Sequence, residues 1–111
     1  MIDKKSLIHK SASIADNVSI GAYAIIGENV SVGEGTVIKE HAVLRANTSM
    51  GKNNTVFQFS TIGEQPQDLK FDNENTTCTI GDNNIIREYS SIHRGTKDGI
   101  SDTIIGNNNL L

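Results

Sequence analysis

The sequence predicts an all-β protein, a parallel β-helix built from six-residue repeats, and three observations support this prediction. An aliphatic side chain returns at every sixth position eleven times in succession, and a small or short residue stands two positions before it. Glycine directly follows the aliphatic residue at seven positions, which accounts for most of the ten glycines. The eleven consecutive aliphatic positions are Ile2, Ile8, Ile14, Ile20, Ile26, Val32, Ile38, Leu44, Met50, Val56 and Ile62.

A period of six fits neither a helix nor a long strand. It fits a short strand that turns one large and one small side chain inward and then ends in a tight corner. The corner is visible in the sequence, because three residues after the aliphatic position stand residue types that readily adopt positive φ. These are Asn17, Asn29, Gly35, Asn47, Asn53, Asn83 and Asn108. Each hexad is therefore expected to form one strand and one corner.

Three hexads close one triangular coil, so residue i is expected to pair with residue i+18 in parallel sheets. We expect about five to six such coils. Stacking them buries columns of aliphatic side chains that no single coil could bury alone. One predicted column contains Ile20, Ile38 and Val56, and another contains Ile26, Leu44, Ile62 and Ile80.

Composition fits a single domain, residues 1–111, with 36% hydrophobic but only 5% aromatic residues, which suits a narrow core. The net charge of −3 and the lack of a basic stripe argue against nucleic acid as a partner. No apolar run is long enough to span a membrane and no signal peptide is visible, so a cytoplasmic protein is expected. The single cysteine, Cys78, stands in a small inward position and is expected to be core.

The repeat is interrupted twice, at an inserted loop over 64–79 and at a second excursion over 95–102. Because Ile80 lies eighteen residues after Ile62, we expect the repeat to resume there on the same face, one coil further. Insertions in a strict repeat collect on the binding face, so the first loop is the first place to look for function. No polar cap follows the last hexad, and we expect the chain to be the front part of a longer one.

Several motifs resemble one family of enzymes. They are Met1-Ile2-Asp3-Lys4, Ile62-Gly63-Glu64, Gln67-Asp68-Leu69-Lys70-Phe71, Ile80-Gly81-Asp82-Asn83, Ile86-Arg87-Glu88 and Ile92-His93-Arg94-Gly95-Thr96. With this spacing the chain resembles the acyl-[acyl-carrier-protein]–UDP-N-acetylglucosamine O-acyltransferases, which begin lipid A biosynthesis. Resemblance to hexapeptide-repeat proteins implies a left-handed coil, against the usual crossover rule. One departure is that the region from Gly27 to Gly35 is a hexad shorter than expected for the family.

The resemblance implies an enzyme that moves a (3-hydroxy)acyl chain from acyl carrier protein to the 3-position of UDP-N-acetylglucosamine, without a cofactor. It implies a homotrimer with active sites between subunits, and a histidine that acts as general base. That histidine would lie beyond Leu111, together with C-terminal coils and any helical domain, so the chain alone is expected to be inactive. The residues that it implies for substrate binding are Gln67, Asp68, Lys70 and His93.

The chemistry of these residues is consistent with the role. Asp68 can accept hydrogen bonds from sugar hydroxyls, Lys70 can place a charge near a diphosphate, and Gln67 can both donate and accept. Two plainer interpretations stay open, a solvated polar loop and a packed structural histidine at position 93. The residues also leave open the acyl-chain length and whether the sugar 3-position carries oxygen or nitrogen.

The repeat alone is also compatible with other classes of function. A non-catalytic trimeric β-helix scaffold, or another hexapeptide acyltransferase, would show the same repeat. A metal-dependent enzyme resembling the γ-carbonic anhydrases needs a close histidine pair and a third histidine from a neighbouring subunit. His9, His41 and His93 are 32 and 52 residues apart and include no such pair. We expect His9 and His41 to be exposed, and no metal site.

Overall fold

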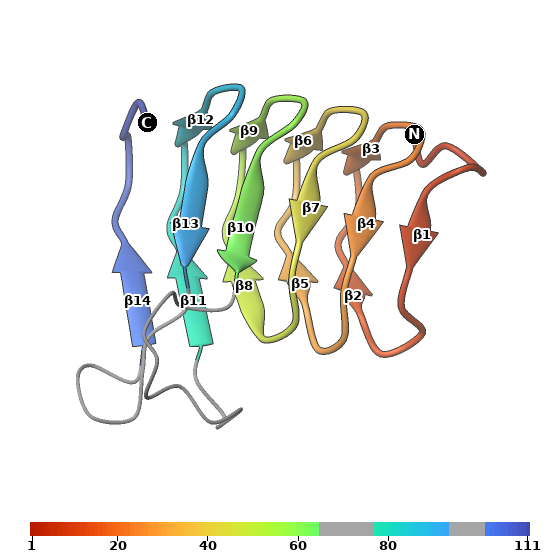
Figure 1. Ribbon diagram of the computed structural model, residues 1–111, viewed down its shortest axis with the longest axis horizontal. Coiled ribbons are helices and arrows are strands. Elements are labelled where there is room, and N and C mark those ends of the chain that lie inside the picture. Colours follow the sequence, from red (N-terminus) through yellow and green to blue (C-terminus); the bar gives the residue numbers. More distant parts are fainter. Residues whose placement is uncertain (65–76, 94–101) are drawn as a thin grey trace.

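The chain forms a three-sided prism of short parallel strands (Figure 1). The computed structural model describes residues 1–64, 77–93 and 102–111, and these ranges contain strands but no helix. Sheet A contains β3 (Ser19–Ile20), β6 (Val37–Ile38), β9 (Thr55–Val56) and β12 (Ile85–Ile86). Sheet B contains β1 (Leu7–Ile8), β4 (Ile25–Ile26), β7 (Val43–Leu44), β10 (Thr61–Glu64) and β13 (Ser91–His93). Sheet C contains β2 (Ser13–Ile14), β5 (Ser31–Val32), β8 (Thr48–Met50), β11 (Thr77–Ile80) and β14 (Asp102–Ile105).

Successive coils stack in the predicted register. Ile20 pairs with Ile38 and Ile38 with Val56 in sheet A, which confirms the first predicted column. From Ile20 to Ile86 the inward aliphatic side chains are almost completely buried, with Ile38 only 1% exposed, whereas those nearer the two ends, such as Ile8 and Ile92, are partly buried. Within the described ranges, no helix could cross a membrane.

The second predicted column is confirmed from Ile26 to Ile62 but was wrong for Ile80. Ile80 lies in sheet C, between Met50 and Ile105, and the residue that stacks on Ile62 is Ile92. The physical reason is that β11 forms the next face of the same coil. The segment between β10 and β11 is therefore extra to the hexad count, and the separation along the column becomes 30 residues instead of 18.

The corners follow the prediction at two edges of the prism. All seven Asn and Gly residues expected at corners have positive φ, between 56° and 76°. The third edge, between sheets A and B, carries ring-bearing residues in the same conformation, with φ of 62° or 63°. We call this edge the aromatic corner: Tyr23, His41, Phe59 and Tyr89.

The rings of the aromatic corner stack along the prism. Ring centroids are 5.3 Å apart from Tyr23 to His41, 5.3 Å from His41 to Phe59 and 5.8 Å from Phe59 to Tyr89. Bulky residues are rarely found at positive φ, and stacking supplies a compensating attraction. His41 is exposed, as expected, and so is His9.

Inside the prism, the small inward positions of sheet A form a hydrogen-bonded column that we call the amide ladder: Thr36, Asn54 and Asn84. Thr36 Oγ1 donates to the Gly51 carbonyl and accepts from the Asn54 backbone N–H. Asn54 Nδ2 donates to the Gly81 carbonyl, 2.8 Å away, and Asn54 Oδ1 accepts from the Asn84 backbone N–H, also at 2.8 Å. The ladder thus satisfies polar groups that the core would otherwise bury without partners.

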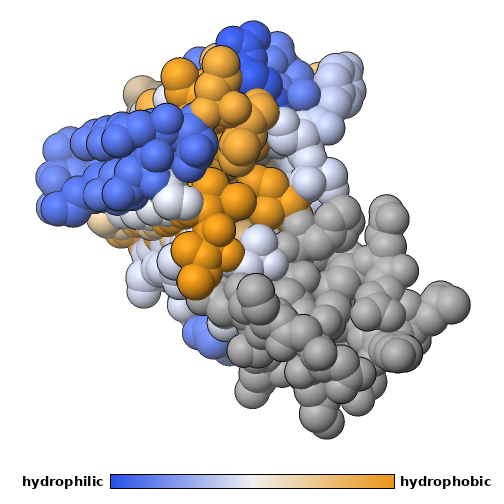
Figure 2. Space-filling model, turned by 90° about the vertical axis from the view of Figure 1, so that its left-hand side faces the viewer, coloured by the Kyte–Doolittle hydropathy of each residue, from blue (hydrophilic) through white to orange (hydrophobic). Residues whose placement is uncertain are grey.

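The end of the prism at β14 has a different surface. β14 is the edge strand of sheet C, and Ile104, Leu110 and Leu111 are exposed beside it. Figure 2 looks at this end and shows apolar atoms gathered on it. The described end at β14 therefore combines an open strand edge with exposed apolar side chains. Cys78, by contrast, is fully buried in sheet C, which confirms its predicted place in the core.

Candidate functional site

His93 is the last residue of β13, on sheet B, next to the strand β10 that ends at Glu64. Glu64 and His93 are backbone partners in this pair of strands. The segment that follows Glu64 contains Gln67, Asp68 and Lys70, which lie outside the described residues, as does the side chain of His93. The structure therefore places the backbone of one predicted site residue and both strand ends that flank the other three.

Both interruptions of the repeat begin and end at the same edge of the prism, the edge between sheets B and C. The first runs from the end of β10 to the start of β11, and the second from β13 to β14. Because β10 pairs with β13 and β11 with β14, the two interruptions belong to adjacent coils. The strand ends that flank Gln67, Asp68 and Lys70, and the backbone of His93, thus lie at one edge of the prism, within two coils.

The described part of this edge shows what a regular corner looks like. In the first coils it is closed by hydrogen bonds: the Asn29 backbone N–H donates to Ser11 Oγ at 2.9 Å, and Asn29 Nδ2 donates to Asn47 Oδ1 at 3.3 Å. His9 Nδ1 lies 2.8 Å from Ser11 Oγ. These polar groups satisfy one another, so this stretch of the edge is a structural corner.

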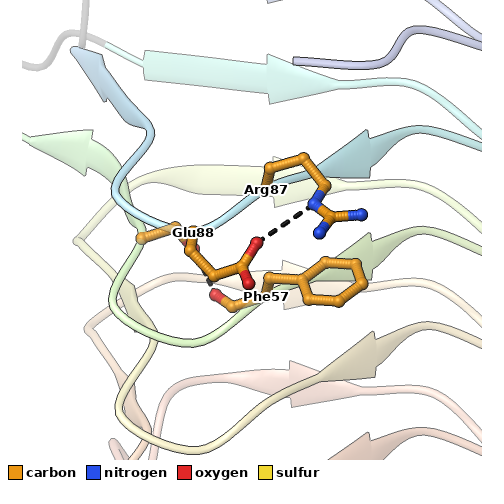
Figure 3. Close-up of polar contacts among 4 residues, drawn as sticks. Phe57, Arg87 and Glu88 are labelled. Atoms are coloured by element: carbon orange, nitrogen blue, oxygen red, sulfur yellow. Dashed lines mark hydrogen bonds and ion pairs between the residues drawn. The ribbon is translucent and has the colours of Figure 1, made fainter.

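A second polar cluster lies on sheet A, on the other side of the prism (Figure 3). The guanidinium carbon Cζ of Arg87 lies 4.3 Å from the ring centroid of Phe57, and Arg87 Nε donates to Glu88 Oε1 at 3.0 Å. Lys39 Nζ lies 5.8 Å from the same ring centroid. The pKa of the Glu88 carboxyl is lowered, first by a hydrogen bond from the backbone N–H of Glu88 and then by the Arg87 guanidinium. Outward Phe57 is therefore covered by cations of the two neighbouring coils.

Two surface hollows lie on the N-terminal coils. One, of about 280 Å³, is lined by Met1, Asp3, Ser19, Ile20, Gly21, Val37, Ile38, Lys39 and Glu40. The other, of about 300 Å³, is lined by Leu7, Ile8, His9, Ile25, Ile26 and Gly27. Neither is lined by residues of β10 or β13, so neither belongs to the predicted site. In the described ranges no three metal-ligating side chains come together, and His9 and His41 lie on different coils and at different edges.

Comparison with known proteins gives consistent results. The family description "Bacterial transferase hexapeptide (six repeats)" matches residues 11–46. The acyl-[acyl-carrier-protein]–UDP-N-acetylglucosamine O-acyltransferase of Psychrobacter sp. (strain PRwf-1) is 50% identical over 110 residues, covering 99% of this chain and 42% of the relative. The protein of the same name from Aliarcobacter butzleri is 57% identical, with the same coverage of 99% and 42%. The crystal structure of UDP-N-acetylglucosamine O-acyltransferase from Moraxella catarrhalis RH4 matches with a TM-score of 0.97 and 48% identity, covering 99% of this chain and 43% of that one.

The repeat, the three parallel sheets and these matches place the chain among the hexapeptide-repeat proteins with a left-handed parallel β-helix. Over its whole length it is related to the N-terminal part of the acyl-[acyl-carrier-protein]–UDP-N-acetylglucosamine O-acyltransferases, which confirms the resemblance drawn from its motifs. The chain spans about two-fifths of the length of the curated relatives it matches.

Proposed function

We propose that this chain supplies the substrate-holding part of an acyltransferase that moves a (3-hydroxy)acyl chain from acyl carrier protein to the 3-position of UDP-N-acetylglucosamine, the first step of lipid A biosynthesis. The observation that carries the proposal is similarity of about 50% identity over 99% of the chain to proteins that bear this name. The backbone is nearly the same as that of the Moraxella catarrhalis protein, with a TM-score of 0.97. This supports the proposal, because matching residues of the two proteins then lie on matching coils.

In this proposal the chain's own residues bind and orient the nucleotide sugar. Asp68 accepts hydrogen bonds from sugar hydroxyls, Lys70 faces the diphosphate, and Gln67 donates and accepts through its amide. His93 lines the same site. This grouping is supported by the described backbone, since the strand ends that flank the loop and the backbone of His93 lie on adjacent coils at one edge of the prism. The general base that removes the proton from the sugar hydroxyl is the histidine implied by the resemblance, outside residues 1–111.

The proposal includes the assembly and its location. The resemblance implies a homotrimer with active sites between its subunits and, with acyl carrier protein as the donor, a cytoplasmic protein. The aromatic corner and Phe57 are the described surfaces that suit an interface, because aromatic side chains are enriched at such surfaces.

The proposal is tested by grafting residues 1–111 onto the remainder of the Psychrobacter relative, in place of the matching 42% of that protein. We expect the graft to acylate UDP-N-acetylglucosamine from acyl carrier protein, and the isolated chain to show no turnover, because substrate-binding residues alone cannot deprotonate a sugar hydroxyl. The assay follows acylated nucleotide sugar by mass spectrometry. A folded graft without activity would contradict the proposal, and so would turnover by the isolated chain.

Within the graft, Asp68→Ala and Lys70→Ala are each expected to lower kcat/KM by about tenfold or more. A lost charged hydrogen bond to substrate corresponds to about 1–3 kcal/mol of transition-state stabilisation. Exposed residues of the same types elsewhere, in Asp16→Ala and Lys52→Ala, serve as controls and should leave the kinetics within about twofold. If the loop variants match these controls, the loop has no part in binding the substrate.

A further inference from the structure

We propose that Gly63 is a positioning residue: it forms a bulge in β10 that sets where His93 lies on the neighbouring strand. The inference rests on the proposed function for the role of His93. Its geometry rests on the φ and pairing of the described backbone and on the side chain of Thr48. The bulge distinguishes this rung of sheet B from all the rungs before it.

The conformation of Gly63 departs from the rule of the repeat. Glycine follows the inward aliphatic residue at seven positions, all of them in described parts of the chain, and only Gly63 among them has positive φ, at 78°. The other glycine of the chain with positive φ in the described ranges, Gly35, stands at a corner, where positive φ is expected. Gly63 therefore has a corner conformation inside a strand, a position where the repeat needs none.

The register of sheet B changes at this residue. In the preceding coils the pairing is regular: Ile26 pairs with Leu44, and Leu44 pairs with Ile62. Between β10 and β13 of the next coil, Ile62 pairs with Ile92 and the following pair is Glu64 with His93. Gly63 therefore has no partner of its own in β13. One extra residue on one strand is a β-bulge, and bulges next to functional sites redirect the side chains that follow.

Thr48 supports the bulge from inside the prism. A Cβ atom added to Gly63 would overlap Thr48 Oγ1, so this hydroxyl fills the space that a side chain at position 63 would take. Thr48 Oγ1 is buried and has no hydrogen-bond partner among the described residues, whereas Thr36 Oγ1, in the equivalent slot of sheet A, donates to the Gly51 carbonyl. A buried hydroxyl without a partner is unfavourable, which indicates that its position is set by packing under Gly63.

A side chain at position 63 would therefore meet two obstacles, an unfavourable φ and an occupied space. The backbone would have to leave the bulge conformation, and the next residue, Glu64, is the one that pairs with His93. Replacing Gly63 should thus displace His93 while the rungs of sheet B below stay in register.

The first test uses the 111-residue chain and the imidazole Cε1–H signals of its three histidines in two-dimensional NMR spectra. In Gly63→Ala we expect the His93 signal to shift and the His9 and His41 signals to stay in place. Gly106→Ala is the control, because Gly106 also follows an inward aliphatic residue, has no positive φ, and a Cβ atom added to it would meet no other atom within 4 Å. It should leave the His93 signal unchanged. A His93 signal that is the same in Gly63→Ala and the unmodified chain would overturn the inference.

If Gly63→Ala does not fold, a further pair of variants can be compared by the same NMR measurement. Thr48→Ala makes room beneath the bulge, so the double variant Gly63→Ala/Thr48→Ala meets only the unfavourable φ. We expect its His93 signal to differ from that of Thr48→Ala alone. Identical signals would show that the conformation of Gly63 does not position His93.

The second test is kinetic and uses the active graft. Gly63→Ala should lower kcat/KM by about tenfold, mainly through a higher KM for UDP-N-acetylglucosamine, and the Asp16→Ala control should change it by less than about twofold. An inactive graft would count against the proposed function. An active graft with unchanged kinetics in Gly63→Ala would count against the inference alone.

Discussion

Replacing Ile38 with aspartate is expected to unfold the chain. Ile38 is 1% exposed and is stacked between Ile20 and Val56 in the middle of the sheet A column. A carboxylate there would be buried without a partner, which costs several kcal/mol against a total stability of about 5–15 kcal/mol for a typical domain. Circular dichroism should show loss of the β signal at a temperature where the unmodified chain is folded.

The control for Ile38→Asp is Val37→Asp, which places the same charge on the same strand but on the outward, partly exposed side. It should keep the β signal. Ile38→Val removes one methylene from the core and should lower the free energy of unfolding by only about 0.5–1.5 kcal/mol. If Ile38→Asp folds as well as Val37→Asp, the side chain of residue 38 does not face the core.

Replacing Asn54 with leucine is expected to lower the free energy of unfolding by about 2–4 kcal/mol, although leucine has a similar size. The change removes the amide that joins two coils of the ladder. It leaves the Gly81 carbonyl and the Asn84 backbone N–H without their partners. Each buried polar group left unsatisfied costs about 1–3 kcal/mol. Urea unfolding followed by circular dichroism measures the difference.

Asn53→Gly is the control for Asn54→Leu. Asn53 is the next residue, exposed at a corner with a φ of 56°, a conformation that glycine adopts readily. Losing its amide should change the free energy of unfolding by less than about 1 kcal/mol. Equal stability of Asn54→Leu and the unmodified chain would mean that the amide ladder does not contribute to the fold.

Much of the fold could be predicted from the sequence because the repeat specifies it locally. The aliphatic period identified the buried column, and Asn or Gly three residues later identified seven corners, all of which have positive φ. Cys78 was predicted as core from its place in the hexad, two positions before Ile80, and is fully buried. Each of these predictions needs only the spacing within one hexad.

Features that depend on which coils lie against each other were harder to predict. Ile80 was assigned to the wrong column because a separation of eighteen residues matches one coil only where no residues are inserted. The amide ladder was missed for the same reason, since Asn54 and Asn84 are 30 residues apart. The aromatic corner was missed because Tyr and Phe are not residue types that favour positive φ.

The candidate site was predicted through the resemblance and not through the repeat. The hexad pattern located the interruption after Glu64, but only the motifs around it indicated Asp68 and His93 as substrate-binding residues. The bulge could not have been seen in the sequence. Glycine follows the aliphatic residue at seven positions, so Gly63 looks like Gly27 until its φ and its pairing are known.

The aromatic corner also gives the prism two natural optical reporters. The chain has no tryptophan and only two tyrosines, and these stand at opposite ends of the same stack of rings, Tyr23 against His41 and Tyr89 against Phe59. Repeat proteins unravel by losing contacts between neighbouring units, often from an end. Near-ultraviolet spectra of Tyr23→Phe and Tyr89→Phe would therefore each follow one end of the stack, and the order in which the two signals disappear on heating would reveal the direction of unwinding.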